Sequence, residues 1–209
     1  MSVNFPPLPS HEHEIEILLQ FLAGVIDGRS AIYVSAPITT GKRFSAWHAN
    51  NGAGFDPSHP EYYEGHLREV IQPNREHARM VVRELRQSAT EAIIDPTAVA
   101  DFPEWTQDDY RYLWAGVIER YVKTLVFING WQYSNGCAYE FLTAKRTGAM
   151  ALDEKQHVIT IEEGIKLIRS AIHEMRSYGV PTEFLEQMLE ELAQMRYDAA
   201  EETCIGQKP

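Results

Sequence analysis

The stretch TLVFINGWQYSNGCAYEFLTAKRTGAMAL, residues 124–152, decides the fold class. It opens with a continuous apolar run, 124–128, which is typical of a parallel strand covered on both faces. A glycine-containing turn follows, and then a helical segment, 137–147, that ends in basic residues and a glycine. A second short apolar run, AMAL at 149–152, comes next. We therefore predict a strand, a helix and a strand in this order.

The same alternation extends upstream. AIYVSA at 31–36 and AIID at 92–95 have the length and apolarity of buried strands, and an amphipathic helix is predicted between them from Pro73. A further helix is predicted after Thr106, and HVITI at 157–161 is a candidate fifth strand. This pattern predicts an α/β fold with an open parallel sheet, flavodoxin-like or Rossmann-like, with ligands bound outside the carboxyl ends of the strands.

Three segments are expected along the chain. Residues 1–30 form an N-terminal arm and a short helix, in which His11 and His13 fit a solvated tail better than a metal site. Residues 31–161 form the α/β domain. Residues 162–209 carry two amphipathic helices, a helical hairpin that either covers the sheet or forms a subunit interface. Both alternatives stay open, and we expect a homo-oligomer.

Composition excludes several classes of protein. The chain has 209 residues, of which 44% are hydrophobic and 23% charged, as in ordinary globular domains. Its net charge of −11 argues against general nucleic-acid binding. Cys137 and Cys204 lie far apart without a zinc-binding pattern, and no apolar run is long enough for a membrane span. Because the N-terminus lacks the features of a signal peptide, we expect a cytoplasmic protein with a small-molecule partner and no membrane contact.

The predicted sheet edge gathers loops 37–43, 96–109 and 129–140. Ser134, Asn135 and Gly136 lie directly before a helix, where free N–H groups can hold an anion. The same field favours an ionised Glu140, a carboxylate suited to act as a nucleophile or to stabilise a cation at a sugar carbon. The alternative is that Glu140 only complements the helix dipole.

A second polar turn, PITTGKR at 37–43, follows the first predicted strand. It offers hydroxyl groups, a flexible Gly41 and the cations Lys42 and Arg43, which suit a phosphate group. It contains neither a P-loop nor a dinucleotide fingerprint, and an ordinary surface turn is the alternative. An arginine stripe on the following helix fits a solvated face better than phosphate binding; it comprises Arg75, Arg79, Arg83 and Arg86.

Taken together, these segments resemble the nucleoside 2-deoxyribosyltransferase and nucleotide N-glycosidase superfamily. The resemblance spans roughly residues 31–152 and rests on IYVSAPITTG at 32–41, the helix from Asn74 that leads to AIIDP, and VFIN followed by SNGCAYEFLTAKRTG. It implies a flavodoxin-like or Rossmann-like core. It also implies an enzyme that transfers or hydrolyses the base of a nucleoside or of its 5′-monophosphate, with neither a metal nor an organic cofactor.

The resemblance implies a role for several residues. The family's nucleophilic glutamate, which attacks C1′, stands six residues after a polar residue, as Glu140 does after Ser134. The monophosphate hydrolases carry serine at the polar position, whereas the nucleoside transferases usually carry aspartate, so a nucleotide is the expected substrate. Tyr33 matches an aromatic hydroxyl that orients the sugar or the glutamate. The implied phosphate-side residues are Ile38, Thr39, Thr40, Gly41, Lys42, Ser134, Asn135 and Gly136.

The chain departs from the family's pattern in three places, one of which is Ala36, where the family has a small glycine after the first strand. The family's acid, which protonates the departing base, falls near Trp114 or Ala115, and the nearest carboxyl groups are Asp109 and Asp108. We expect Asp109 to serve. The insertion at 43–65 exceeds the family's loop, and its aromatic residues are expected to pack on the core rather than stack on a base; they are Trp47, His48, Phe55, Tyr62 and Tyr63.

The sequence thus predicts a retaining N-glycosidase or deoxyribosyltransferase-like enzyme that acts on a nucleoside 5′-monophosphate or related nucleotide. Glu140 is its expected nucleophile. The alternative is a catalytically silent nucleotide-binding or sensing module on the same scaffold, because fold does not imply function.

Overall fold

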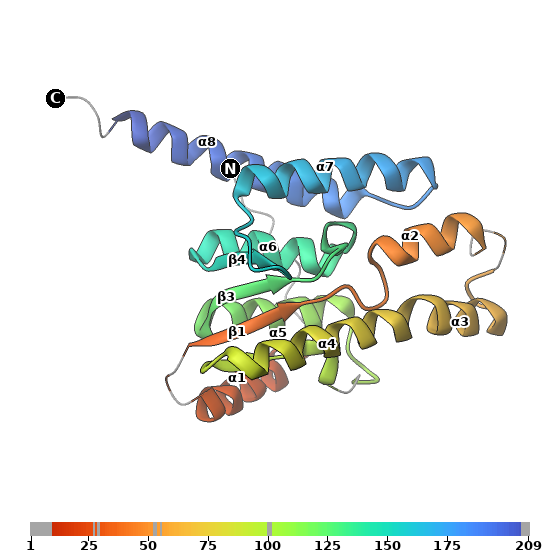
Figure 1. Ribbon diagram of the computed structural model, residues 1–209, viewed down its shortest axis with the longest axis horizontal. Coiled ribbons are helices and arrows are strands. Elements are labelled where there is room, and N and C mark those ends of the chain that lie inside the picture. Colours follow the sequence, from red (N-terminus) through yellow and green to blue (C-terminus); the bar gives the residue numbers. More distant parts are fainter. Residues whose placement is uncertain are drawn as a thin grey trace.

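A four-stranded parallel sheet forms the centre of the computed structural model, which describes residues 10–26, 28, 30–51, 54, 56–99 and 102–205. The strands are β1 (Ala31–Ser35), β2 (Ala92–Ile94), β3 (Val122–Phe127) and β4 (Met150–Asp153), in the order β2-β1-β3-β4 (Figure 1). This confirms the predicted α/β class. The order reverses between β1 and β3, and such a switch point is where open sheets of this kind bind ligands.

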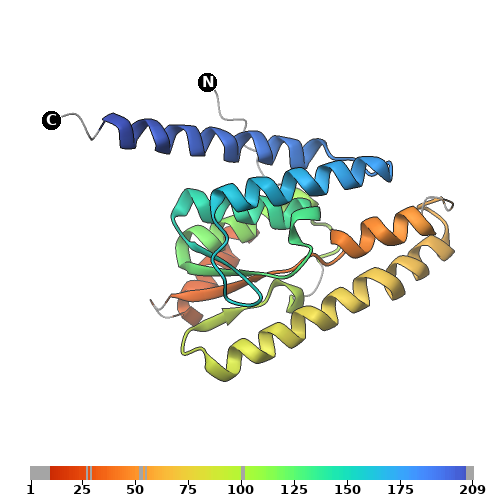
Figure 2. The same ribbon diagram turned by 45° about the horizontal axis from the view of Figure 1, so that its top comes forward.

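Helices cover both faces of the sheet. On one face, α4 (Gln72–Ser88) packs its buried side chains against the strands; this cluster comprises Val34, Ala78, Val81, Val82, Val126 and Ile128. On the other face lie α5 (Gln107–Tyr121) and α6 (Asn135–Thr147), and α1 (Glu12–Ile26) packs on α5. Figure 2 shows α4 on the side of the sheet opposite to α6. The main core therefore lies between β1, β3 and the helices α5 and α6.

The predicted C-terminal hairpin is present as α7 (Ile161–Ser177) and α8 (Glu183–Ile205). The two helices run side by side and form an outer layer over α6 (Figure 2). Their apolar stripes belong to the main core; the buried members are Ile165, Ile168, Ala171, Ile172, Met175, Leu185, Met188 and Leu192. Since the chain itself covers these stripes, they do not require a second subunit, and the homo-oligomer stays a prediction.

The candidate fifth strand at 157–161 is wrong. Only one antiparallel bridge, between Leu152 and Val158, joins this segment to β4. The chain reverses at 153–157, where the Asp153 carboxylate accepts hydrogen bonds from the backbone N–H groups of Lys155 and His157. A strand that returns directly through such a turn cannot be parallel to β4.

The insertion at 43–65, which stands where the family has a loop, is largely helical. Its helices are α2 (Gly41–Asn50) and α3 (Pro60–His66), and α3 continues through the π-helical turn η2 (Leu67–Ile71) into α4. Figures 1 and 2 show that α2, α3 and η2 extend away from the sheet, and we call this segment, 41–71, the arm. The arm's aromatic rings contact one another; they are Phe44, Trp47, His48, Tyr62 and His66. Phe55 lies outside the described residues.

The predicted N-terminal tail is shorter than expected. Its first nine residues lie outside the described part of the chain, but α1 already begins at Glu12, and the ring of His11 stacks on Trp105. His13 is exposed on α1. None of the helices in the described part of the chain combines the length and the apolarity that crossing a membrane requires.

Candidate functional site

The carboxylate of Glu140 is held at the carboxyl end of β1 by two hydroxyl groups. Tyr33 Oη donates to Glu140 Oε1, and Ser35 Oγ donates to Glu140 Oε2, each over 2.6 Å. Tyr33 and Ser35 are two residues apart on a strand, so they point to the same face of the sheet, the one that α6 covers. Both are fully buried, whereas Glu140 keeps partial exposure. The two hydrogen bonds therefore fix the orientation of the carboxylate against β1.

Burial controls the ionisation of this carboxylate. It raises the pKa of Glu140 to about 7, although the hydrogen bonds from Ser35 and Tyr33 act in the opposite direction. The sequence predicted that the helix field keeps Glu140 ionised. However, Glu140 is the sixth residue of α6, beyond the first turn where free N–H groups act. The pKa of Tyr33 is raised by burial and by the charge of Glu140, so its hydroxyl stays a donor.

A second group of hydroxyls lies at the N-terminus of α6. Thr40 Oγ1 donates to Ser134 Oγ over 3.0 Å, which joins the two turns that the sequence selected for phosphate. Ser134 occupies the N-cap position, but its side chain makes no capping hydrogen bond. Gly41 is required beside Thr40, because its φ is +87° and a Cβ there would lie 2.6 Å from Pro37 Cβ.

The remaining predicted phosphate-side residues surround this pair. Lys42 is exposed, and its Nζ lies 6.0 Å from the centroid of the Tyr133 ring. Asn135 and Gly136 form the partly exposed start of α6. On the other turn, Ile38 is half-buried and Thr39 exposed.

Cys137 was not predicted for the site, yet its thiol lies beside the hydroxyl groups of Ser35 and Ser134. Burial and the charge of Glu140 raise its pKa to about 12, so the thiol is neutral at physiological pH. Ser35 was also missed. Its position two residues after Tyr33 on a predicted strand is a signal that could have identified it.

Asp109 does not join this group. Its carboxylate accepts hydrogen bonds from the Thr106 backbone and hydroxyl, both 2.7 Å, and from the His11 backbone, 3.2 Å. Thr106 in turn caps α5, which completes a capping box. Burial raises the pKa of Asp109, but the hydrogen bonds from Thr106 and His11 outweigh it and hold the pKa at about 2. The arrangement favours a capping role, and the acid role stays a prediction.

We expect Asp109→Asn to destabilise the fold by about 1–2 kcal/mol, because it weakens a helix cap. The depressed pKa of Asp109 means that its contribution to stability is present above about pH 4 and is lost as the pH falls toward 2. Denaturant unfolding at pH 7 and pH 3 measures both effects, with the exposed Asp198→Asn as control. If the variant keeps its stability but loses base release, Asp109 is a catalytic acid rather than a cap.

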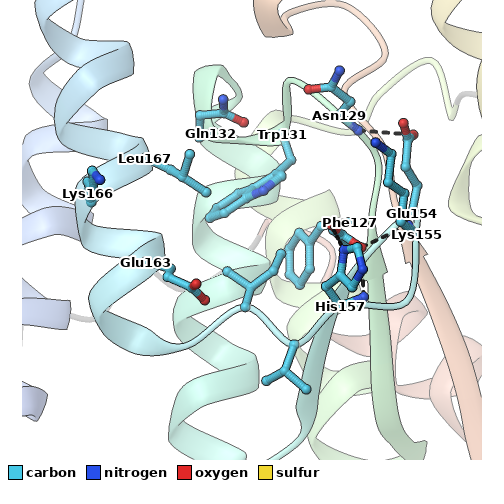
Figure 3. Close-up of a pocket in the computed structure, with 13 residues that line it drawn as sticks. Phe127, Asn129, Trp131, Gln132, Glu154, Lys155, His157, Glu163, Lys166 and Leu167 are labelled. Carbon is cyan, nitrogen blue, oxygen red and sulfur yellow. Dashed lines mark hydrogen bonds and ion pairs between the residues drawn. The ribbon is translucent and has the colours of Figure 1, made fainter.

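A separate pocket of about 660 Å³ lies at the carboxyl ends of β3 and β4, beside α7 (Figure 3). Phe127 and Trp131 lie on its apolar side, and charged residues surround them. Several of these charged residues pair locally: His157 with Asp153, and Glu154 with His77. Glu140 is not among the lining residues.

Within the described part of the chain, no group of three or more His, Cys, Asp or Glu side chains is arranged to hold a metal ion. No protein-family model matches the chain, and neither a curated protein nor a solved structure matches it significantly.

Proposed function

We propose that the protein cleaves the N-glycosidic bond of a nucleoside 5′-monophosphate or related nucleotide through a covalent intermediate on Glu140. The observation that carries the proposal is the Glu140 carboxylate, which Tyr33 and Ser35 hold by one oxygen each at 2.6 Å at the carboxyl end of β1. A carboxylate fixed in this way meets the positional demand on a nucleophile, because its orientation is set before the substrate arrives.

The chemistry balances with this chain's own groups and water. A Glu140 oxygen forms a bond to C1′ while the C1′–N bond breaks, and the bonding electron pair leaves with the base. Water then attacks C1′ and the ester bond to Glu140 breaks, which frees the carboxylate. The proton that the water loses is taken up by the departed base anion, and the sugar keeps its original configuration. If a second base attacks instead of water, the same intermediate gives transfer.

The 5′-phosphate is assigned to the N-terminus of α6. Ser134 is nearly buried there beside Thr40, and the first N–H groups of the helix add positive potential. Lys42 supplies a nearby cation. The nucleotide would therefore lie across the switch point between β1 and β3, with C1′ at Glu140.

A panel assay tests the proposal. The purified protein is incubated with the common nucleosides, 2′-deoxynucleosides and their 5′-monophosphates, and released base is resolved by chromatography. We expect release from at least one monophosphate. If no member of the panel loses its base while some of them bind, the nucleotide-binding module is the correct account.

Ser134→Asp should weaken the use of monophosphates selectively. The new carboxylate would face a dianionic phosphate, so we expect KM for the monophosphate to rise about tenfold or more, with little change for the matching nucleoside. Ser134→Asn, which has the same size without the charge, is the matched control. Equal losses for both substrate classes would show that Ser134 does not face the phosphate.

A further inference from the structure

Three consecutive carbonyl groups of the 37–41 turn are held by one long helix. The Asn74 side-chain amide donates to Ile38 O over 3.0 Å and to Thr40 O over 3.2 Å. His66 Nε2 lies 2.7 Å from Thr39 O and must be the donor, because a carbonyl oxygen only accepts. His66 ends α3 and Asn74 lies in the first turn of α4, so both belong to the continuous helical segment 60–88.

Asn74 is an unusual residue for its position. It is only 8% exposed, and asparagine is a poor helix former whose burial is costly unless its amide is satisfied. Here the amide is satisfied on both sides, since Arg43 Nη1 approaches Asn74 Oδ1 at 3.4 Å. The hydrogen bonds of the Asn74 side chain are therefore directed at the turn and at the start of α2.

Thr40 connects this arrangement to the site. Its carbonyl is held by Asn74, and its hydroxyl donates to Ser134 at the N-terminus of α6. Thr40 thus links the buried Asn74 amide to the Ser134 hydroxyl, which we assign to the phosphate subsite. If the turn relaxed, the Thr40 hydroxyl would lose its fixed position, and binding would have to order it again.

We propose that Asn74 is a positioning residue that preassembles the phosphate subsite and acts on it through Thr40; the inference rests on the proposed function. His66 supports the same turn through Thr39. The helical arm at 41–71 is then part of the site's scaffold, because it carries the residue that fixes the middle carbonyl of the turn.

Isothermal titration calorimetry tests this role in the Glu140→Gln background, where ligand is not consumed. The probes are 2′-deoxyadenosine 5′-monophosphate, inorganic phosphate and 2′-deoxyadenosine. Asn74→Asp keeps the size of the side chain but turns its donor into an acceptor that faces two carbonyl oxygens. We expect it to weaken the two phosphate-bearing probes by about tenfold or more, with 2′-deoxyadenosine unchanged.

Gln72→Glu is the matched control, since it makes the same amide-to-carboxylate change at an exposed position of the same helix. It should leave all three affinities unchanged. His66→Phe serves as a second variant if Asn74→Asp does not fold. It keeps a ring stacked on Trp47 but removes the hydrogen bond to Thr39, and a smaller loss with the same selectivity is expected.

The outcomes distinguish a failure of the positioning role of Asn74 from a failure of the proposed function. Unchanged phosphate affinity in a folded Asn74→Asp variant would overturn the role of Asn74 and leave the proposed function standing. Where that variant does not fold, unchanged affinity in His66→Phe would overturn the claim that hydrogen bonds from the helix to the turn preassemble the subsite. Equal losses for the nucleoside and its monophosphate would also overturn the positioning role, because a merely structural defect acts on both. If the Glu140→Gln parent binds neither phosphate-bearing probe, the phosphate subsite is refuted together with this inference, while the panel assay still decides the chemistry at Glu140.

Discussion

Glu140→Gln is expected to abolish base release and, at the same time, to stabilise the protein at alkaline pH. The substitution keeps the volume of the side chain but removes the nucleophile, so a loss of about three or more powers of ten in kcat is expected. The remaining activity would come from binding and positioning alone. Base release measured by chromatography, with circular dichroism to verify folding, gives the result.

The gain in stability follows from the raised pKa of Glu140. In the unfolded chain this carboxyl titrates near 4.5, whereas in the fold its pKa is about 7. A carboxyl with a raised folded pKa contributes stability that is complete below pH 4.5 and is lost as the pH rises through 7. Above pH 7 the wild-type protein therefore carries a buried charge at a cost of about 3 kcal/mol.

A neutral glutamine avoids this cost. Thermal unfolding of both proteins at pH 5 and pH 8 should show a difference in favour of the variant that is larger at pH 8. Exposed Glu190→Gln is the control and should show no such pH dependence. Near-wild-type turnover in a folded Glu140→Gln protein refutes the nucleophile. An equal stability difference at both pH values refutes the raised pKa.

Tyr33→Phe and Ser35→Ala should each lower kcat/KM by about 10- to 100-fold at pH 7, because each removes a hydrogen bond to a charged group that must be held in place. For the wild type we expect kcat/KM to fall about tenfold per pH unit below pH 7, as the free Glu140 becomes protonated.

Both hydrogen bonds lower the pKa of Glu140, so either substitution should move this acidic limb to higher pH. Full pH profiles measure the shift. Thr143→Val, a buried hydroxyl on the same helix that bonds the Tyr139 carbonyl, is the control for general loss of a polar group. If the midpoint of the acidic limb of kcat/KM is the same in Tyr33→Phe, in Ser35→Ala and in the wild type, the ionisation of Glu140 does not set that limb.

Continuous apolarity made the strands predictable. The runs at 31–36, 92–95 and 124–128 match β1, β2 and β3 within two residues at each end. Strands of a parallel sheet that helices cover leave little room for polar side chains, and even the half-buried edge strand β2 is apolar. The family resemblance implied that Tyr33 orients either the sugar or Glu140. The structure shows a hydrogen bond of 2.6 Å from Tyr33 to Glu140, and the part that Tyr33 plays in a reaction stays a prediction.

Tertiary contacts explain what the sequence did not reveal. The arm at 41–71 shows no apolar period because its rings face one another between α2 and α3 instead of forming a stripe toward the core. Asn74 looked like an ordinary polar residue at a helix start, since nothing in the sequence indicates that three distant carbonyls meet it and His66.

For Asp109, in contrast to Asn74, the sequence itself indicates the local hydrogen bonds that the structure shows. Thr106 and Asp109 have the spacing of a capping box, and this local pattern accounts for the hydrogen bonds of the Asp109 carboxylate. Its role as the acid in base release stays a prediction.

The configuration at C1′ after cleavage tests the central claim most directly. The reaction is run in water containing methanol with the β-nucleotide that the panel identifies, and the methyl glycoside formed is examined by proton nuclear magnetic resonance. Attack by Glu140 followed by attack by methanol inverts C1′ twice, so the account predicts the β-methyl glycoside. A product with the α configuration would mean a single displacement by solvent and would contradict a covalent intermediate on Glu140.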